Sequence, residues 1–353
     1  MRIHTQYITN SRIFIGLLIL LFSLQGCKSS EAELLSYDLP DHNATTILDY
    51  SENSITINFP EELRSANDFV ADFLLSEGAE AFVDEKLQTS GHSENNYEKP
   101  FAFQIVSEDG KNSAEWMVNS VNSDICSRYG LGGFLQEEKS HNREYPWYIN
   151  QSETGIFSDY NCAPTSIVMC GLWCNENFPY SVIDARSMYQ PNGGGWYSSD
   201  IDNCLNDFKI QHAIIPLSNI SSESTEIIKE QIDNGNLIIL CVDVHYLRLC
   251  ENDSVHCDKY YRTIKLGTGH CIVLKGYKKV DGQLFFEAYD PSGYSFCYKD
   301  GTSKGINRYY RSEDVYTATF AYWNYVFVIS DSNSIPPAKK SLKASEIPDV
   351  QVF

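Results

Sequence analysis

Alternating polar and apolar residues mark the first third of the chain as β-structure. Residues 54–60 (SITINFP) and 101–106 (FAFQIV) have the period of two that is typical of half-buried strands. A turn over residues 108–111 separates the second strand from a returning strand at 113–118. Short strands joined by turns predict a small, all-β antiparallel sandwich over residues 37–123.

Helical patterns follow in the second half. A helix is expected to begin at Cys162 or Ala163, because Pro164 suits the first turn, where a missing N–H costs nothing. Ile167 and Leu172 belong to its apolar stripe. Further helices are expected over about 180–189, 199–208 and 223–234, the last ended by Gly235.

Apolar runs then predict strands at 237–244, 270–277, 283–289 and 322–329. Asp281-Gly282 is a strong hairpin signal between the second and third of these strands. Helices followed by antiparallel strands indicate an α+β domain over residues 149–330.

The segments outside the two domains differ in composition. Residues 124–148 are polar and contain three glycines, which predicts an irregular linker that packs partly on the second domain. Residues 331–353 are rich in Pro, Lys and Ser, which predicts a flexible tail. Two domains suit a chain of 353 residues, and the net charge of −20 argues against a nucleic-acid partner.

The first 26 residues have the pattern of a secretory signal peptide. Arg2 and Arg12 precede an apolar run at 13–21, which is too short for a comfortable membrane span. Leu24-Gln25-Gly26-Cys27 resembles the bacterial lipobox. That resemblance implies cleavage before Cys27 and its lipidation, with residues 27–36 as a tether; an ordinary signal peptide with a stray cysteine is the alternative.

Eleven cysteines are many for an exported chain, in which disulfides are allowed. Cys250 and Cys257 bracket a polar loop and are the pair expected to be joined, whereas Cys241 and Cys271 suit buried apolar positions. No Cys or His spacing matches a structural zinc site, and no cofactor is expected.

Cys162 stands where a thiol can become a nucleophile. The N–H groups and dipole at a helix start favour thiolate over thiol and can stabilise an oxyanion. A cysteine at a helix start is nevertheless more often structural than catalytic, so the position alone does not decide its role.

The hairpin supplies the partners that a nucleophile needs. His270 opens one strand, and Asp290 follows the strand that returns after Asp281-Gly282, so the two side chains are expected to meet. Gln151 could donate a second hydrogen bond to an oxyanion. The rival bases His245 and His256 precede no paired strand that ends in Asp, and Asp243 is a weaker candidate than Asp290 for the orienting carboxylate.

These motifs together resemble the C39-like branch of the papain-like cysteine peptidases, over about residues 149–330. The matching residues, in the family's order, are Gln151, Cys162 with Pro164-Thr165-Ser166, Gly269-His270 and Asp290-Pro291. The resemblance implies a papain-like fold with Cys162, His270, Asp290 and Gln151 as catalytic residues. Ala163 departs from the family's usual Gly, a change that a helix start tolerates because it needs no positive φ.

A second resemblance concerns residues 37–123. The matching stretches are 57–60 (INFP), 75–79 (LSEGA), 106–110 (VSEDG) and 115–118 (EWMV), and they resemble immunoglobulin-like modules common in surface lipoproteins of Bacteroidetes-type bacteria. No catalytic cluster lies in this region, so a spacer or adhesion module is expected.

The sequence therefore predicts a cysteine peptidase that is lipid-anchored to a bacterial membrane outside the cytoplasm and acts on peptides or proteins. The outer membrane is expected, on its periplasmic side or at the cell surface. A papain-fold acyltransferase or transpeptidase, and a catalytically inactive binding lipoprotein, remain alternatives. Cleavage specificity and oligomeric state are left open.

Overall fold

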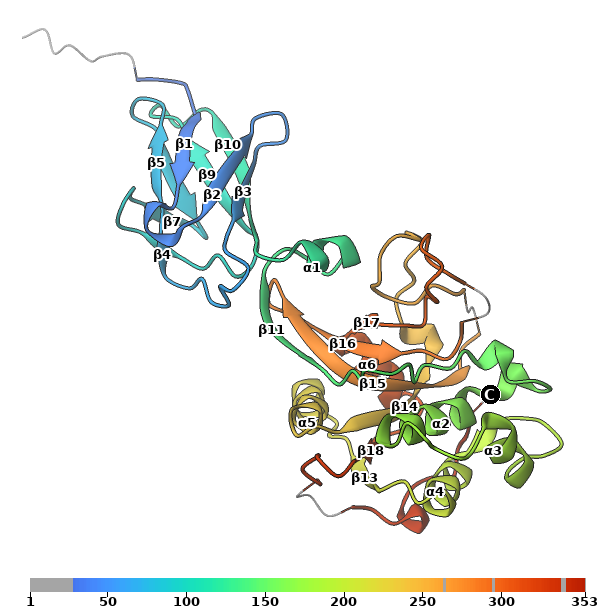
Figure 1. The fold of residues 1–353 in the computed structure, drawn as a ribbon. Coiled ribbons are helices and arrows are strands. Elements are labelled where there is room, and N and C mark those ends of the chain that lie inside the picture. The colour runs from blue at the N-terminus through green and yellow to red at the C-terminus, as the bar shows by residue number, and fades with distance from the viewer. Residues whose placement is uncertain (1–27, 263–264, 294–295, 338–340, 353) are drawn as a thin grey trace, which may run out of the picture.

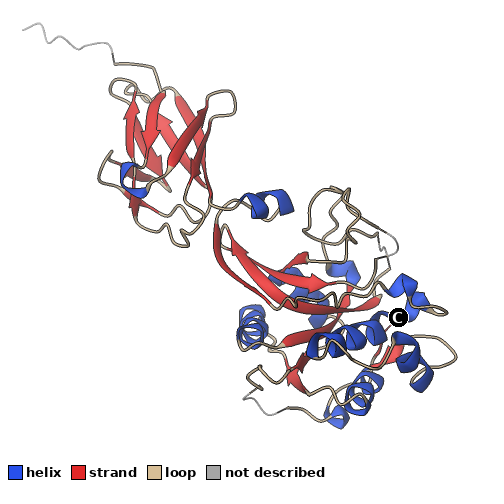
Figure 2. Cartoon of the chain, in the orientation of Figure 1, coloured by secondary structure: helices blue, strands red, loops and turns tan. Residues whose placement is uncertain are grey.

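The computed structural model describes residues 28–352 except 263–264, 294–295 and 338–340 (Figure 1). Its β-sheets and helices are distinguished in Figure 2. The expected signal peptide and Cys27 lie outside the described residues. Within the described part of the chain, no helix is long and apolar enough to cross a membrane.

The N-terminal module is built from strands, as its alternating pattern predicts. Its main sheet has the order β2 (Thr45–Asp49), β3 (Ser54–Asn58), β10 (Ser113–Val121), β9 (Phe101–Val106), β6 (Glu80–Val83) and β7 (Lys86–Gln88). Two further pairs are β1 (Leu34–Asp38) with β5 (Asp72–Leu75), and β4 (Phe69–Val70) with β8 (Glu94–Asn95). Side chains of the main sheet and of the β1–β5 pair share one core. The expectation of a purely antiparallel sandwich is wrong at one place: β3 and β10 run parallel, which the long connection between them permits.

The segment expected to be an irregular linker contains two regular elements. They are α1 (Asp124–Tyr129) and β11 (Leu135–Ser140), and β11 pairs with strand β15 of the second domain. Phe134 packs in the core of the N-terminal module, while Leu135 packs with Val280 of the second domain. The composition of the segment conceals this, because β11 (LQEEKS) is an edge strand with mostly polar side chains.

The main sheet of the second domain is antiparallel, and β11 adds to it beside β15. The order is β13 (His212–Pro216), β18 (Tyr325–Ile329), β14 (Leu237–Asp243), β15 (Gly269–Val280), β16 (Gln283–Tyr289) and β17 (Arg308–Arg311). The predicted strands correspond to β14, β15, β16 and β18, and the predicted helices to α2 (Cys162–Cys174), α3 (Val182–Met188), α4 (Ser198–Asp207) and α5 (Ser221–Asp233). Strands β13 and β17 and helix α6 (Ser312–Phe320) were not predicted.

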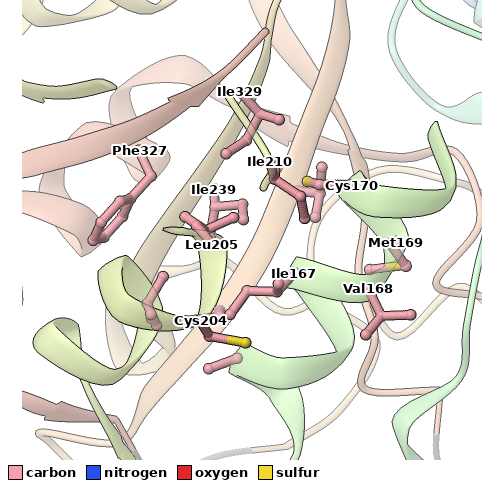
Figure 3. Close-up of a cluster of buried hydrophobic side chains, with 14 of the residues drawn as sticks. Ile167, Val168, Met169, Cys170, Cys204, Leu205, Ile210, Ile239, Phe327 and Ile329 are labelled. Carbon is pink, nitrogen blue, oxygen red and sulfur yellow. The ribbon is translucent and has the colours of Figure 1, made fainter. Parts of the chain in front are cut away.

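The two faces of this sheet carry different helices, because side chains alternate along each strand. Cys271 and Val273 of β15 pack against α2 and α4, whereas Ile272 and Leu274 pack against α5 and α6. Figure 3 shows the first of these cores, with Ile167 and Cys170 of α2 near Leu205 of α4 and Ile239 of β14.

The tail expected to be flexible is packed on the second domain. It contains η5 (Ala344–Glu346) and β19 (Gln351–Val352), and β19 pairs with β12 (Trp196–Tyr197). Ile347 and Val352 are buried. The prediction is wrong because a few apolar residues at the very end of a polar segment are enough to bind it.

The expected Cys250–Cys257 disulfide is absent. Cys257 is buried and Cys250 partly exposed, and all ten cysteines in the described part of the chain are free thiols. Cys241 and Cys271 are fully buried in strands, as predicted.

A buried ion pair joins the middle of the sheet to β11. The Lys275 ammonium, which has no exposed surface, donates to Glu287 Oε1 at 2.8 Å and to Ser140 Oγ at 3.0 Å. It also donates to Asn142 Oδ1 at 2.6 Å. Because every donor is used, the charge is compensated where solvent does not reach it.

Removing this ammonium should destabilise the fold strongly. Lys275→Met leaves the Glu287 carboxylate buried without its cation, and the free energy of unfolding should fall by about 3–5 kcal/mol in urea denaturation. Lys278→Met is the matched control, because its partner Glu138 is 46% exposed and such a pair contributes only about 0–1 kcal/mol. If both variants lost the same free energy of unfolding, the buried Lys275–Glu287 pair would not have the stabilising role assigned to it.

Candidate active site

Cys162 is the first residue of α2, as the sequence predicts, and only 3% of it is exposed. At this position the thiol faces the unpaired N–H groups and the positive end of the helix. The preceding Asn161 does not cap the helix with its side chain. Its side chain is instead part of a network that holds the loop before the helix.

The buried side chain of Arg186, on α3, holds that loop by hydrogen bonds. Its Nε donates to Asn161 Oδ1 at 2.8 Å and its Nη2 donates to the Tyr160 carbonyl at 2.7 Å. Asn161 Nδ2 in turn donates to Thr154 Oγ1 at 2.9 Å, and Thr154 Oγ1 donates to the Gln151 carbonyl at 2.6 Å. One buried cation therefore fixes both the start of α2 and the turn that bears Gln151.

The β15–β16 hairpin brings His270 and Asp290 together. Asp281 and Gly282 both have positive φ, 50° and 79°, in the tight turn that returns the chain. His270 Nε2 lies 2.7 Å from Asp290 Oδ1, and the Asp290 side chain has no exposed surface. The Ser292 N–H also donates to Oδ1, at 2.9 Å.

Tyr310 of β17 holds the other oxygen of the same carboxylate. Its hydroxyl donates to Asp290 Oδ2 at 2.5 Å, and Tyr261 donates to the same oxygen at 3.3 Å. Burial raises the pKa of Asp290, but the His270 charge and the hydrogen bonds from His270 and Tyr310 outweigh it, so the pKa is lowered overall. The carboxylate is thus held ionised and in one orientation.

The imidazole of His270 connects this carboxylate to the thiol. Its Nε2 is engaged by Asp290, so Nδ1 is the nitrogen left to serve Cys162, whose thiol interacts with the imidazole. Burial lowers the pKa of His270, but the Asp290 charge and the hydrogen bonds to Asp290 and Cys162 raise it to about 10. His270 therefore holds a proton next to the sulfur at neutral pH.

Cys271 is a second neighbour of the thiol that sequence reasoning did not connect with it. Cys271 follows His270 on β15 and packs in the same core cluster as Cys162. The contact with Cys271 is the largest cause that raises the pKa of Cys162, followed by burial, whereas His270 lowers it. Two opposite influences thus meet at one sulfur atom.

Gln151 lies in the same pocket. It is 2% exposed, its N–H donates to the Pro291 carbonyl at 2.8 Å, and its Nε2 donates to the Ser158 carbonyl at 3.1 Å. A pocket of about 390 Å³ is lined by Gln151, Asp159, Cys162, Val244, Tyr261, Arg262, Thr268, Gly269, His270, Ser292 and Phe296. The structure thus brings Gln151, Cys162 and His270 to one cavity, with Asp290 behind His270.

The rival residues lie elsewhere. His245 is exposed in a short 3-10 turn. His256 stacks between Tyr129 and Tyr298. Asp243 accepts the N–H groups of His245 and Gly267 and makes no hydrogen bond to His270.

No group of three His, Cys, Asp or Glu side chains within the described residues is arranged to hold a metal ion. The functional groups gathered at the candidate site are a thiol, an imidazole, a carboxylate and an amide. Of the residues that sequence reasoning missed, Tyr310 and Arg186 had no local signal, because each acts on a segment far from it in the chain.

Replacing Cys271 should change the pH at which the Cys162 thiol becomes reactive. Cys271→Ala removes the largest cause of the raised thiol pKa, so the pH midpoint for alkylation of Cys162 by iodoacetamide should fall. Mass spectrometry of the Cys162 peptide measures it over a pH series. Cys170→Ala, another buried cysteine on α2, should leave the midpoint unchanged, and an unshifted midpoint in Cys271→Ala would show that this contact does not control the thiol.

Comparison with known proteins assigns part of the chain to a family. Residues 144–326, just over half of the chain, match the Peptidase_C39 like family. No curated protein matches the chain.

Among solved structures, a candidate C39-like peptidase from Bacillus anthracis is 14% identical; the match covers 58% of this chain and 100% of that one, with a TM-score of 0.37. A candidate secreted protein from Bacteroides fragilis is 14% identical over 26% of this chain and 94% of its own, with a TM-score of 0.21. A candidate glycoside hydrolase from Bacteroides thetaiotaomicron is 12% identical over 89% and 99%, with a TM-score of 0.23. The similarity to these structures is low, and the family match is what places the protein: through residues 144–326, the chain belongs to the Peptidase_C39 like family.

Proposed function

We propose that the protein is a cysteine peptidase that hydrolyses peptide bonds with Cys162 as nucleophile. The observation that carries the proposal is the contact of the helix-start thiol with an imidazole held by a buried carboxylate. A thiol, a base and a group that orients the base form an activated nucleophile.

The residues divide the reaction as follows. The Cys162 thiolate attacks the carbonyl carbon, and the amide C–N bond breaks as protonated His270 gives its proton to the leaving amine. The product is a thioester on Cys162 and a free amine. His270 then takes a proton from water, whose oxygen attacks the thioester and releases the acid and the thiolate, and the proton stays on His270. Asp290 keeps the imidazole in the orientation that both steps need.

Charge on the attacked oxygen needs donors that are fixed in advance. Gln151 reaches the pocket with a side-chain amide whose Nε2 has a second hydrogen besides the one given to Ser158. The N–H groups at the start of α2 are the other donors. Gln151 is anchored through Pro291, next to Asp290, so donor and base share one support.

The site is proposed to work outside the cytoplasm. The lipobox-like sequence that ends at Cys27 supports a lipid anchor on a bacterial membrane, on the periplasmic side of the outer membrane or at the cell surface. The β-rich module, immunoglobulin-like in the resemblance of its strands, would then act as a spacer between the anchor and a peptide or protein substrate.

A second candidate is a binding protein whose thiol does not react. The raised pKa of Cys162, caused first by Cys271 and then by burial, favours the neutral thiol in the free protein. Transfer of the acyl group to an amine other than water is a third outcome, and products formed with an added amine acceptor separate it from hydrolysis.

Removing the nucleophile tests the proposal directly. Cys162→Ala should reduce hydrolysis by roughly 10⁶-fold, to background, as loss of a catalytic nucleophile does. New N-termini in a peptide library, measured by mass spectrometry, report the activity. Cys174→Ala, at the opposite end of the same helix, should keep it. Hydrolysis that survives in Cys162→Ala would rule the assignment out.

Tyr310 is a positioning residue whose loss should change the pH profile. Tyr310→Phe removes a donor from the Asp290 carboxylate, so the pKa of Asp290 should rise. Activity that needs ionised Asp290 is present above its pKa and lost as pH falls through it, so the acidic limb of kcat/KM should move to higher pH.

The same variant should lower kcat/KM at neutral pH by about tenfold or more, because hydrogen bonds to charged groups contribute about 1.5–3 kcal/mol. Tyr309→Phe is the control, since Tyr309 packs in a different cluster on the other face of β17. A fall in activity without any shift of the acidic limb would indicate a structural role only.

A further inference from the structure

The last strand of the chain is paired at the border of the candidate site. Strand β19 runs antiparallel to β12, with Val352 opposite Trp196 and Gln351 opposite Tyr197. Gln351 Nε2 also donates to the Gly195 carbonyl at 3.0 Å. In Figure 1 the red C-terminal segment runs up to the region of α2 and α3.

Contacts link β19 to the pocket that contains Cys162. Strand β19 packs against β15, whose first two residues are Gly269 and His270. The Tyr322 hydroxyl donates to the Gln351 carbonyl, and its ring lies so close to Gly269 that a Cβ there would meet Tyr322 Cζ at 2.4 Å. Gly269 itself lines the pocket. Val352 packs in the same core cluster as Cys162.

The segment before β19 has its own anchor, separate from the strand pairing. Ser198 Oγ donates to the Pro348 carbonyl at 3.0 Å, and the Ser198 N–H donates to the Val350 carbonyl at 3.3 Å. The Ser199 N–H donates to Asp349 Oδ1 at 3.1 Å, and Ile347 is buried. The chain is thus fixed up to Val350, and residues 351–352 extend from that anchor along β12.

Strand β12 is suited to an extended polypeptide. Among the described residues β19 is its only strand partner, so without β19 its backbone groups would form an open edge. Gly195 permits a very close approach, since a Cβ there would lie 1.7 Å from the Val352 carbonyl oxygen. Main-chain pairing at an edge of this kind depends little on the side chains of the bound strand.

We propose that β12 is a peptide-binding edge of the candidate site, and that β19 occupies it in the free protein as an intramolecular competitor. The inference rests on the proposed peptidase function, because an extended peptide substrate must displace β19 before it lies along β12. A tethered segment has a high effective concentration, so it lowers the apparent affinity of any competing peptide.

The test uses a chain that ends at Val350, which keeps the anchor at Ser198 and removes only the pairing strand. On an unstructured peptide substrate, apparent KM should fall by about tenfold, the factor expected if the edge is free for about a tenth of the time. The value of kcat should not change. Lys343→Ala, an exposed position in the same segment, is the control and should behave like the unmodified chain.

A binding measurement makes the inference independent of activity. In a Cys162→Ala background, a fluorescently labelled peptide of residues 345–353 should bind a chain that ends at Lys343, in which both the anchor and the edge are free, at least tenfold more tightly than it binds the full chain, as followed by fluorescence anisotropy. Gly195→Ala in the shortened chain should abolish this binding, because the new Cβ occupies the place of the Val352 carbonyl. Thermal melting checks that each variant is folded.

The outcomes separate the two proposals. An unchanged KM together with no binding of the labelled peptide to the chain that ends at Lys343 would overturn the role of β19 and leave the peptidase proposal intact. Binding that is lost in Gly195→Ala, in a protein that hydrolyses no peptide, would support the edge and overturn the peptidase proposal.

Discussion

The β15–β16 hairpin is the constraint on which both the candidate site and the attachment of the N-terminal module depend. Its open end holds His270 against Asp290 at 2.7 Å. Its turn end holds the other domain, because the Asp281 carboxylate accepts the N–H groups of Gly133 and Phe134 at 3.0 and 2.8 Å. Between the two ends, Lys275 and Glu287 form a buried ion pair. One element therefore fixes both the geometry of the candidate site and the attachment of the N-terminal module.

The thiol lies between two neighbours that act in opposite directions. His270, charged because Asp290 raises its pKa to about 10, favours the thiolate. Cys271 and burial favour the thiol. Both neighbours are consecutive residues at the start of β15, and Cys162 is the first residue of α2, which packs on that strand. A substrate that changes the solvation of this pocket would change the balance, so the free protein and the complex need not hold the thiol in the same protonation state.

The sequence predicted those parts of the site that depend on local order. Asp281-Gly282 fixes a tight turn, and a tight turn places Asp290 near His270 whatever the rest of the fold does. Tyr310 and Arg186 could not be found in this way. Tyr310 reaches Asp290 only because β17 pairs with β16, and Arg186 reaches Asn161 only because α3 packs under the start of α2. Both contacts are set by tertiary register, for which a single sequence holds no periodic signal.

The absence of a sequence signal for tertiary pairing also explains why the segments on either side of the second domain were wrongly predicted as an irregular linker and a flexible tail. Strand β11 and strand β19 are polar or very short, so composition places them among loops, yet each completes a backbone edge that the rest of the domain leaves open. Edge pairing draws its energy from main-chain hydrogen bonds and depends little on side-chain type. Because the pairing depends little on side-chain type, β19 is not recognised from its sequence. For the same reason another extended chain could replace it on β12. A partner held mainly by its backbone is replaceable by any extended peptide, whereas one held by a specific side-chain lock is not.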